Sequence, residues 1–135
     1  MKIINEKPPI FEEAHKHFEI DDRATIYTYG NAIYNPAGLN ITQELIEHES
    51  THARQQKAIG GPDIWWRNYF DDPNFRFEQE AEAYGRQHEY YCTLVADRNA
   101  RARHLHLLAV ILASPMYKVG VSHNEAMRAI RANSK

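Results

Sequence analysis

A short stretch near the middle of the chain has the residue types and spacing of a metal site. His48, Glu49 and His52 stand in the order His-Glu-x-x-His. Residues four apart lie on one face of an α-helix, so both imidazoles can bind one cation there. Zinc accepts neutral imidazole nitrogen, and a catalytic zinc site uses three protein ligands and one water molecule. Glu49 would lie beside the cation and take a proton from that water, which is the chemistry of metal-assisted hydrolysis.

The segment around this motif predicts the helix that the spacing requires. Apolar Ile41 and Leu45 precede His48 by seven and three residues, on the stripe that a helix turns toward the protein core. Over residues 41–56 both histidines are therefore expected to point inward. A buried imidazole without a partner costs on the order of 1–3 kcal/mol, and a divalent cation would supply that partner to both rings.

A glutamate-rich stretch further along the chain supplies candidate carboxylates. A helix is predicted over about 75–95, and this segment contains Glu78, Glu80 and Glu82. At roughly 100° per residue, Glu80 falls on the same side as the apolar residues of the segment, whereas Glu78 and Glu82 fall on the outer side. Glu80 would therefore complete a ligand set of two histidines and one carboxylate.

Two further candidates follow Glu80 on nearly the same helix face. Tyr84 and His88 come at successive steps of four residues, so either side chain can donate a hydrogen bond to a developing oxyanion or fix a metal ligand. Both are predicted as candidate catalytic residues. A competing interpretation of Glu80 is that it only forms an ion pair with an arginine, either Arg54 or Arg76.

Residues 24–34 carry the pattern of a β-hairpin. The segment is rich in threonine, tyrosine and isoleucine, and Gly30-Asn31 in its middle suits a two-residue turn. Asn40, with Gln43 three positions later, predicts a capping pair at the start of the histidine helix. If one edge of the hairpin is free, a peptide or protein substrate can pair with it and lie across the metal site. An equally open interpretation is that the hairpin only covers the core.

The remaining segments predict a single, mainly helical α+β domain over 1–135. A capping box that opens at Ser122 predicts a short last helix, and Asp97 has the type and position of the N-cap of the helix before it. The N-terminal segment 1–23 contains a proline pair and is expected to be irregular or to hold a short helix over 11–20. A small antiparallel hairpin or sheet would precede the histidine helix, and a second helix would supply the glutamate ligand.

The composition excludes some classes of partner. The chain has 135 residues, 16 basic and 18 acidic side chains and a formal net charge of −2, so neither nucleic acid nor an anionic membrane is an expected partner. Its single cysteine, Cys92, allows no internal disulfide, and the N-terminus lacks the pattern of a signal peptide. The expected location is therefore a reducing compartment, the cytoplasm.

The two stretches together resemble a known family. HESTHARQQ over 48–56, followed by RFEQEAEAY over 76–84, is similar to the zincin metallopeptidases, in particular to the gluzincin branch and to small HExxH domain proteins of bacteria and their phages. The likeness extends over roughly 24–91. It implies a zincin-like fold, one zinc ion per chain, and a cytoplasm that belongs to a bacterium or to a phage-infected host.

The resemblance also implies roles for individual residues. His48, His52 and Glu80 would hold the zinc ion. Glu49 would be the general base in the hydrolysis of peptide or amide bonds.

Two departures from the family pattern matter. The downstream gluzincin motif commonly carries an aspartate where this chain has Tyr84, which keeps Glu78 open as the ligand in place of Glu80. The chain is also too short for the second lobe that gives larger members a deep substrate cleft. Two other functions therefore stay open: a catalytically inactive, zinc-stabilised binding or virion-associated protein, and a metal-free helical interaction domain.

Overall fold

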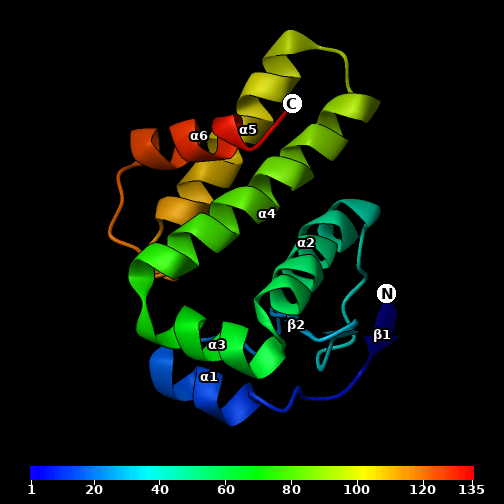
Figure 1. Ribbon diagram of the computed structural model, residues 1–135. Coiled ribbons are helices and arrows are strands. Elements are labelled where there is room, and N and C mark those ends of the chain that lie inside the picture. The colour runs from blue at the N-terminus through cyan, green and yellow to red at the C-terminus, as the bar shows by residue number, and fades with distance from the viewer.

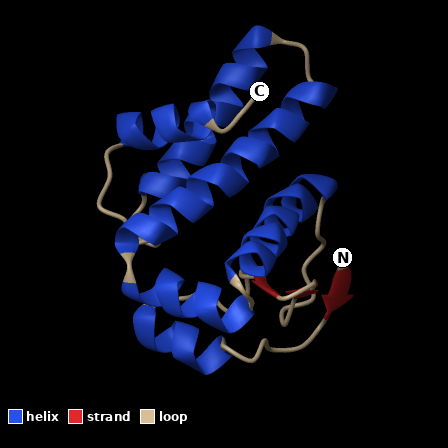
Figure 2. Ribbon diagram, in the orientation of Figure 1, coloured by secondary structure: helices blue, strands red, loops and turns tan.

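The computed structural model describes all 135 residues and has a mainly helical α+β fold. Figures 1 and 2 show helices that form most of the molecule, with a small sheet near the N-terminus. The elements in chain order are β1 (Lys2–Ile4), α1 (Phe11–His17), β2 (Tyr27–Tyr29), β3 (Ala32–Tyr34), α2 (Gln43–Ile59), α3 (Pro62–Asp71), α4 (Pro73–Leu94), α5 (Arg98–Ala113) and α6 (His123–Ala132).

The sheet has three strands in the order β1-β3-β2. The predicted hairpin is confirmed: β2 and β3 are antiparallel and turn at Gly30-Asn31, where Gly30 has a φ of 63° that favours glycine. The expectation of a purely antiparallel sheet is wrong, because β1 pairs parallel with β3, with Ile3 opposite Ile33. A strand of three residues carries too little periodic pattern to be recognised in a sequence.

Helix α2 begins two residues later than expected and runs from Gln43 to Ile59. The predicted cap at Asn40 is wrong, because Thr42 is the N-cap and its hydroxyl oxygen accepts a hydrogen bond from the backbone N–H of Leu45. The helix ends at Gly60, whose φ of 111° is left-handed. The predicted histidine helix is therefore confirmed, and local sequence signals explain both of its ends.

Helix α4 is the central element of the fold. It starts after Asp72, whose carboxylate accepts hydrogen bonds from two backbone N–H groups, and it lies alongside α2 on one side (Figure 1). On the other side it packs against α5 and α6, where Ala81 and Tyr84 join a core with leucine, alanine and isoleucine side chains. At Gly85 the end of α6 comes so close that a Cβ atom would overlap Asn133.

A second core lies around α3 and α1. Trp65, Trp66 and Tyr69 on α3 pack with Tyr27 on β2 and with Ala14 on α1. A short helix is thus confirmed in the N-terminal segment, and it closes the lower end of the molecule in the view of Figure 1. The helices predicted from the caps at Asp97 and Ser122 are confirmed as α5 and α6.

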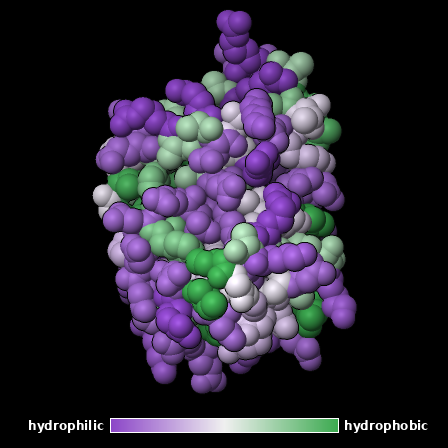
Figure 3. Space-filling view, in the orientation of Figure 1, coloured by the Kyte–Doolittle hydropathy of each residue, from purple (hydrophilic) through white to green (hydrophobic).

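The face of the molecule that Figure 3 shows is mostly polar. Figure 3 shows hydrophilic residues over most of one face, with a few hydrophobic groups between them. No helix combines the length and the apolar character that a bilayer-spanning segment requires.

Candidate metal centre

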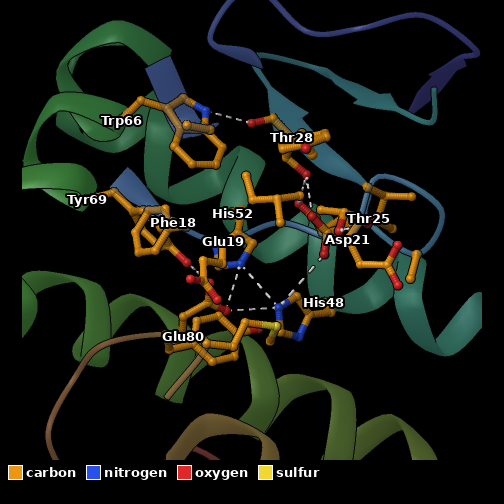
Figure 4. A pocket seen from close by; sticks show the side chains of 18 of the residues that line it. Phe18, Glu19, Asp21, Thr25, Thr28, His48, His52, Trp66, Tyr69 and Glu80 are labelled. Atoms are coloured by element: carbon orange, nitrogen blue, oxygen red, sulfur yellow. Dashed lines mark hydrogen bonds and ion pairs between the residues drawn. The ribbon is translucent and has the colours of Figure 1, made fainter. Parts of the chain in front are cut away.

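Three side chains from α2 and α4 meet at one point in the interior. The Nε2 atoms of His48 and His52 lie 3.2 Å apart, and Oε1 of Glu80 lies 3.1 Å from each of them (Figure 4). A tetrahedral zinc ion with bonds of about 2.0–2.1 Å separates its ligand atoms by roughly 3.3 Å. The donor set and its spacing therefore fit a divalent cation.

The residues of the motif are buried together. His48, Glu49 and His52 are only 5%, 8% and 5% exposed. Their ligand atoms lie within 4.8 Å of one another, so the group can hold a metal ion. Polar groups at this depth need partners.

The structure separates the candidate carboxylates of α4. Glu80 is buried, as the helical periodicity predicts, and its Oε2 accepts a hydrogen bond from the Tyr69 hydroxyl at 2.6 Å. Glu78 is exposed. Neither arginine of the competing interpretation pairs with Glu80: Arg54 donates to a threonine hydroxyl, and Arg76 donates to backbone carbonyls. Glu80 is therefore the carboxylate that faces the histidines.

Glu49 occupies a different position beside the same triangle. Its Oε2 lies 3.8 Å from Nε2 of His48, further away than the carboxylate of Glu80. Its Oε1 accepts a hydrogen bond from the hydroxyl of Thr28 on β2 at 2.9 Å. One oxygen is thus held by the strand, while the other lies on the side of the His48 imidazole.

Neighbouring buried charges in the triangle shift the pKa values of His52 and Glu80. Burial alone would lower the pKa of His52, but the carboxylates of Glu80 and Glu49 outweigh that effect and raise it to about 9. Burial opposes ionisation of Glu80, yet His52 and His48 hold the pKa of this carboxyl far below its ordinary value. The ionised Glu80 therefore requires a cation opposite it, either a proton on the imidazoles or a metal ion that replaces that proton.

Tyr84 and His88, the two candidate catalytic residues of α4, contact different parts of the molecule. The ring of Tyr84 packs edge-on against His48 at 4.4 Å between centroids, and its hydroxyl hydrogen-bonds the hydroxyl of Tyr117 at 2.6 Å. His88 lies one turn further along α4, and its Nδ1 is 2.8 Å from Nδ1 of His104 on α5. The structure brings Tyr84 to the edge of the triangle and does not bring His88 to it.

A pocket of about 230 Å³ opens beside the triangle. Most of its lining is apolar, with side chains such as Phe18, Ile20 and Trp66, and its polar lining includes the four clustered site residues (Figure 4). Tyr117 also lines it, although it comes from the loop between α5 and α6. Arg76 holds this loop in place because its guanidinium donates to the carbonyl of Tyr117.

Neither Tyr117 nor Tyr69 is among the site residues that the sequence predicts. Tyr69 lies on α3 and packs against Trp65 and Trp66 in the core. No local pattern distinguishes either residue, because each reaches the site through tertiary packing.

Strand β2 is at the edge of the sheet next to the pocket. The carbonyl of Thr28 already accepts hydrogen bonds from Nε2 of Gln56 at 2.8 Å and from Nε1 of Trp66 at 2.9 Å. A peptide that pairs with this edge would therefore have to use the residues just before β2, at 24–26. These residues line the pocket.

Comparisons with known proteins give no independent indication of a family. No protein-family model matches the chain, and neither the curated proteins nor the solved structures contain a match. The function of this chain is therefore inferred from the geometry and chemistry of the site.

Proposed function

We propose that this chain is a zinc-dependent hydrolase of peptide or amide bonds with a zincin-like active site. The observation that carries the proposal is the buried triangle of His48, His52 and Glu80, with Glu49 beside it. Two imidazoles and one carboxylate are a known ligand set of catalytic zinc. Three protein ligands also leave a position open for water or substrate.

Each residue then has a distinct task in hydrolysis. When bound, zinc polarises the scissile carbonyl and lowers the pKa of the attacking water toward about 7. Glu49 accepts the proton of that water and passes it to the leaving amine. The Thr28 hydroxyl holds Oε1 of Glu49, so the proton moves through the other oxygen.

Tyr117 is the side chain that we assign as the hydrogen-bond donor to the developing oxyanion. Its ring lines the pocket, and in this proposal its hydroxyl oxygen accepts the hydrogen bond from the Tyr84 hydroxyl, which leaves its own proton free to be donated. Burial, with the negative charge of Glu80 next in importance, raises the pKa of Tyr117 well above its ordinary value. The phenol therefore stays protonated and can donate a hydrogen bond. Tyr84 acts through Tyr117 in this proposal.

The pocket favours a particular kind of substrate. An extended peptide along 24–26 would place an apolar side chain against the rings of Phe18 and Trp66. Glu19 and Asp21 also line this region and are exposed, so a negatively charged residue is disfavoured there.

One experiment tests the proposal against its competitors. Protein purified without chelator is analysed for metal and incubated with a mixed peptide library, with and without a zinc chelator. Cleavage that requires about one zinc per chain supports the hydrolase. Zinc without cleavage identifies the metal as a structural clip in a binding or virion-associated protein, and protein without metal identifies a metal-free interaction domain.

A further inference from the structure

The ring nitrogens of His48 and His52 that face away from the triangle both contact glutamine side chains. Nδ1 of His48 lies 2.9 Å from Oε1 of Gln87 on α4, and Nδ1 of His52 lies 2.8 Å from Oε1 of Gln55 on α2. Each histidine is thus held by the side-chain amide of a glutamine. An amide can present either its carbonyl or its NH₂ group, so its orientation needs a cause.

The cause is a second carboxylate behind each glutamine. Nε2 of Gln87 donates to Oε1 of Glu44 at 2.8 Å. Nε2 of Gln55 donates to Oε1 of Glu82 at 2.7 Å, and to a backbone carbonyl at 3.0 Å. Ionised carboxylates and carbonyls only accept hydrogen bonds, so the NH₂ end of each amide must face them. The carbonyl end must then face the imidazole.

The direction of these bonds fixes the protons on both histidines. A carbonyl oxygen accepts only from a protonated nitrogen, so Nδ1 of His48 and Nδ1 of His52 each carry a proton. In a neutral imidazole the other nitrogen, Nε2, then has a free lone pair. Those Nε2 atoms are the ones that meet Glu80 in the triangle.

We propose that two glutamate–glutamine pairs, Glu44 with Gln87 and Glu82 with Gln55, are positioning residues that preset the metal-binding tautomer of His48 and His52. Partners of this kind behind metal-bound histidines fix the ring and its tautomer, and their loss typically weakens metal binding by 10–100-fold. The inference rests on the metal site of the proposed function, but it does not depend on hydrolysis.

The Glu44 pair continues into a longer chain. Glu44 Oε1 also accepts from Nε2 of His104 at 2.7 Å, and Nδ1 of His104 lies 2.8 Å from Nδ1 of His88. With neutral imidazoles, His88 donates to His104 and His104 donates to Glu44, so every donor points toward the carboxylate. Burial, followed by the charges of His104 and Arg101, lowers the pKa of His88 and favours that neutral form. His88 therefore supports the site from a distance.

Replacing either glutamine with leucine tests the assignment. Gln87→Leu and Gln55→Leu keep the side-chain size but remove the acceptor. We expect each variant to bind zinc about 10–100-fold more weakly than the wild type in a competition assay with a chelating dye. Gln43→Leu is the matched control, because Gln43 is an exposed residue of α2 whose amide contacts only Glu47. Its zinc affinity should equal that of the wild type.

A spectroscopic signature separates positioning from general damage to the fold. In ¹⁵N-edited NMR spectra of zinc-loaded protein, the protected Nδ1–H protons of His48 and His52 should give two resonances. Gln87→Leu should lose only the His48 resonance, and Gln55→Leu only that of His52. The double exchange Glu44→Gln with Gln87→Glu reverses the order of the two groups. The carboxylate at position 87 would then accept from Nδ1–H of His48, and the amide at position 44 would donate to that carboxylate. Zinc affinity should therefore return toward that of the wild type.

The outcomes are distinguishable. If both leucine variants bind zinc as tightly as the wild type, the positioning role is overturned and the hydrolase proposal is untouched. If the wild type binds zinc but cleaves no peptide, the hydrolase proposal fails while the affinity comparison still decides the positioning role. If the wild type binds no divalent metal, both fail. If the leucine variants do not fold, the double exchange decides, and a zinc affinity more than 100-fold below the wild type would contradict the inference.

Discussion

Glu80 and His52 are joined across two helices, with Oε1 of the carboxylate 3.1 Å from Nε2 of the imidazole. The histidine is on α2 and the carboxylate on α4, so the site exists only when these helices are packed together. Binding of a metal ion at this site would therefore be coupled to folding.

Glu49→Gln should abolish hydrolysis and keep the metal. The amide cannot accept the proton of the attacking water, and loss of a general base typically lowers kcat by about 10²–10⁴-fold. The Thr28 hydroxyl can still donate to the amide oxygen, so the fold around the site should persist. Zinc content per chain and kcat on a cleaved library peptide are the two measurements. A variant as active as the wild type would exclude Glu49 as the base.

Glu80→Gln should weaken zinc binding strongly, whereas Glu78→Gln should not. The first change removes the buried negative charge opposite both imidazoles, while the second alters an exposed side chain two residues away. Calorimetric titration of each metal-free variant with zinc measures the two affinities. Loss of zinc affinity in the Glu78 variant alone would return the ligand role to Glu78, and equal loss in both variants would contradict the assignment to Glu80.

Tyr117→Phe should lower kcat on the order of 10²-fold without loss of zinc, because an oxyanion donor acts only in the transition state. Tyr84→Phe leaves the Tyr117 hydroxyl in the pocket and should cost less, since it removes only the hydrogen bond that orients this hydroxyl. Steady-state kinetics on one peptide give kcat and KM for both variants. Activity that survives in Tyr117→Phe and disappears in Tyr84→Phe would reverse the two roles.

His88 should make the protein less stable in mild acid. Its pKa is lowered in the folded state, so the unfolded chain binds a proton at higher pH than the folded chain does. The free energy of unfolding should therefore fall as the pH drops below about 6.5, the ordinary histidine pKa, until the pH passes the folded pKa of His88.

Urea unfolding with chelator present, at several values between about pH 5 and 8, measures this dependence. His88→Gln should flatten the curve, and the matched control His106→Gln, at an exposed histidine of α5, should leave it unchanged. A His88→Gln curve as steep as that of the wild type would refute the prediction.

Local periodicity was sufficient for the parts of the site that lie on long helices. The spacing of His48 and His52 predicted their helix and its buried face, and the position of Glu80 in its helix predicted that this carboxylate points inward. Capping chemistry predicted the helices that begin after Asp97 and Ser122.

The parts that depend on tertiary contacts could not be predicted in the same way. Gln87 lies two turns after Glu80, on nearly the same face, but nothing in the sequence indicates that Glu44 stands behind it. Tyr117 enters the pocket because Arg76, far earlier in the chain, holds its loop. The cap at Thr42 was missed because Asn40 offered an equally suitable side chain two residues earlier.

The occupied carbonyl of Thr28 also affects how copies of this chain behave at high concentration. An exposed strand edge with free N–H and C=O groups is a template for pairing between molecules. Gln56 and Trp66 take up the outward carbonyl of β2, and at the opposite edge β1 is only three residues long and begins with a lysine. Both edges of the sheet are therefore protected against pairing with strands of other molecules, and so against the fibrous aggregates that such pairing produces.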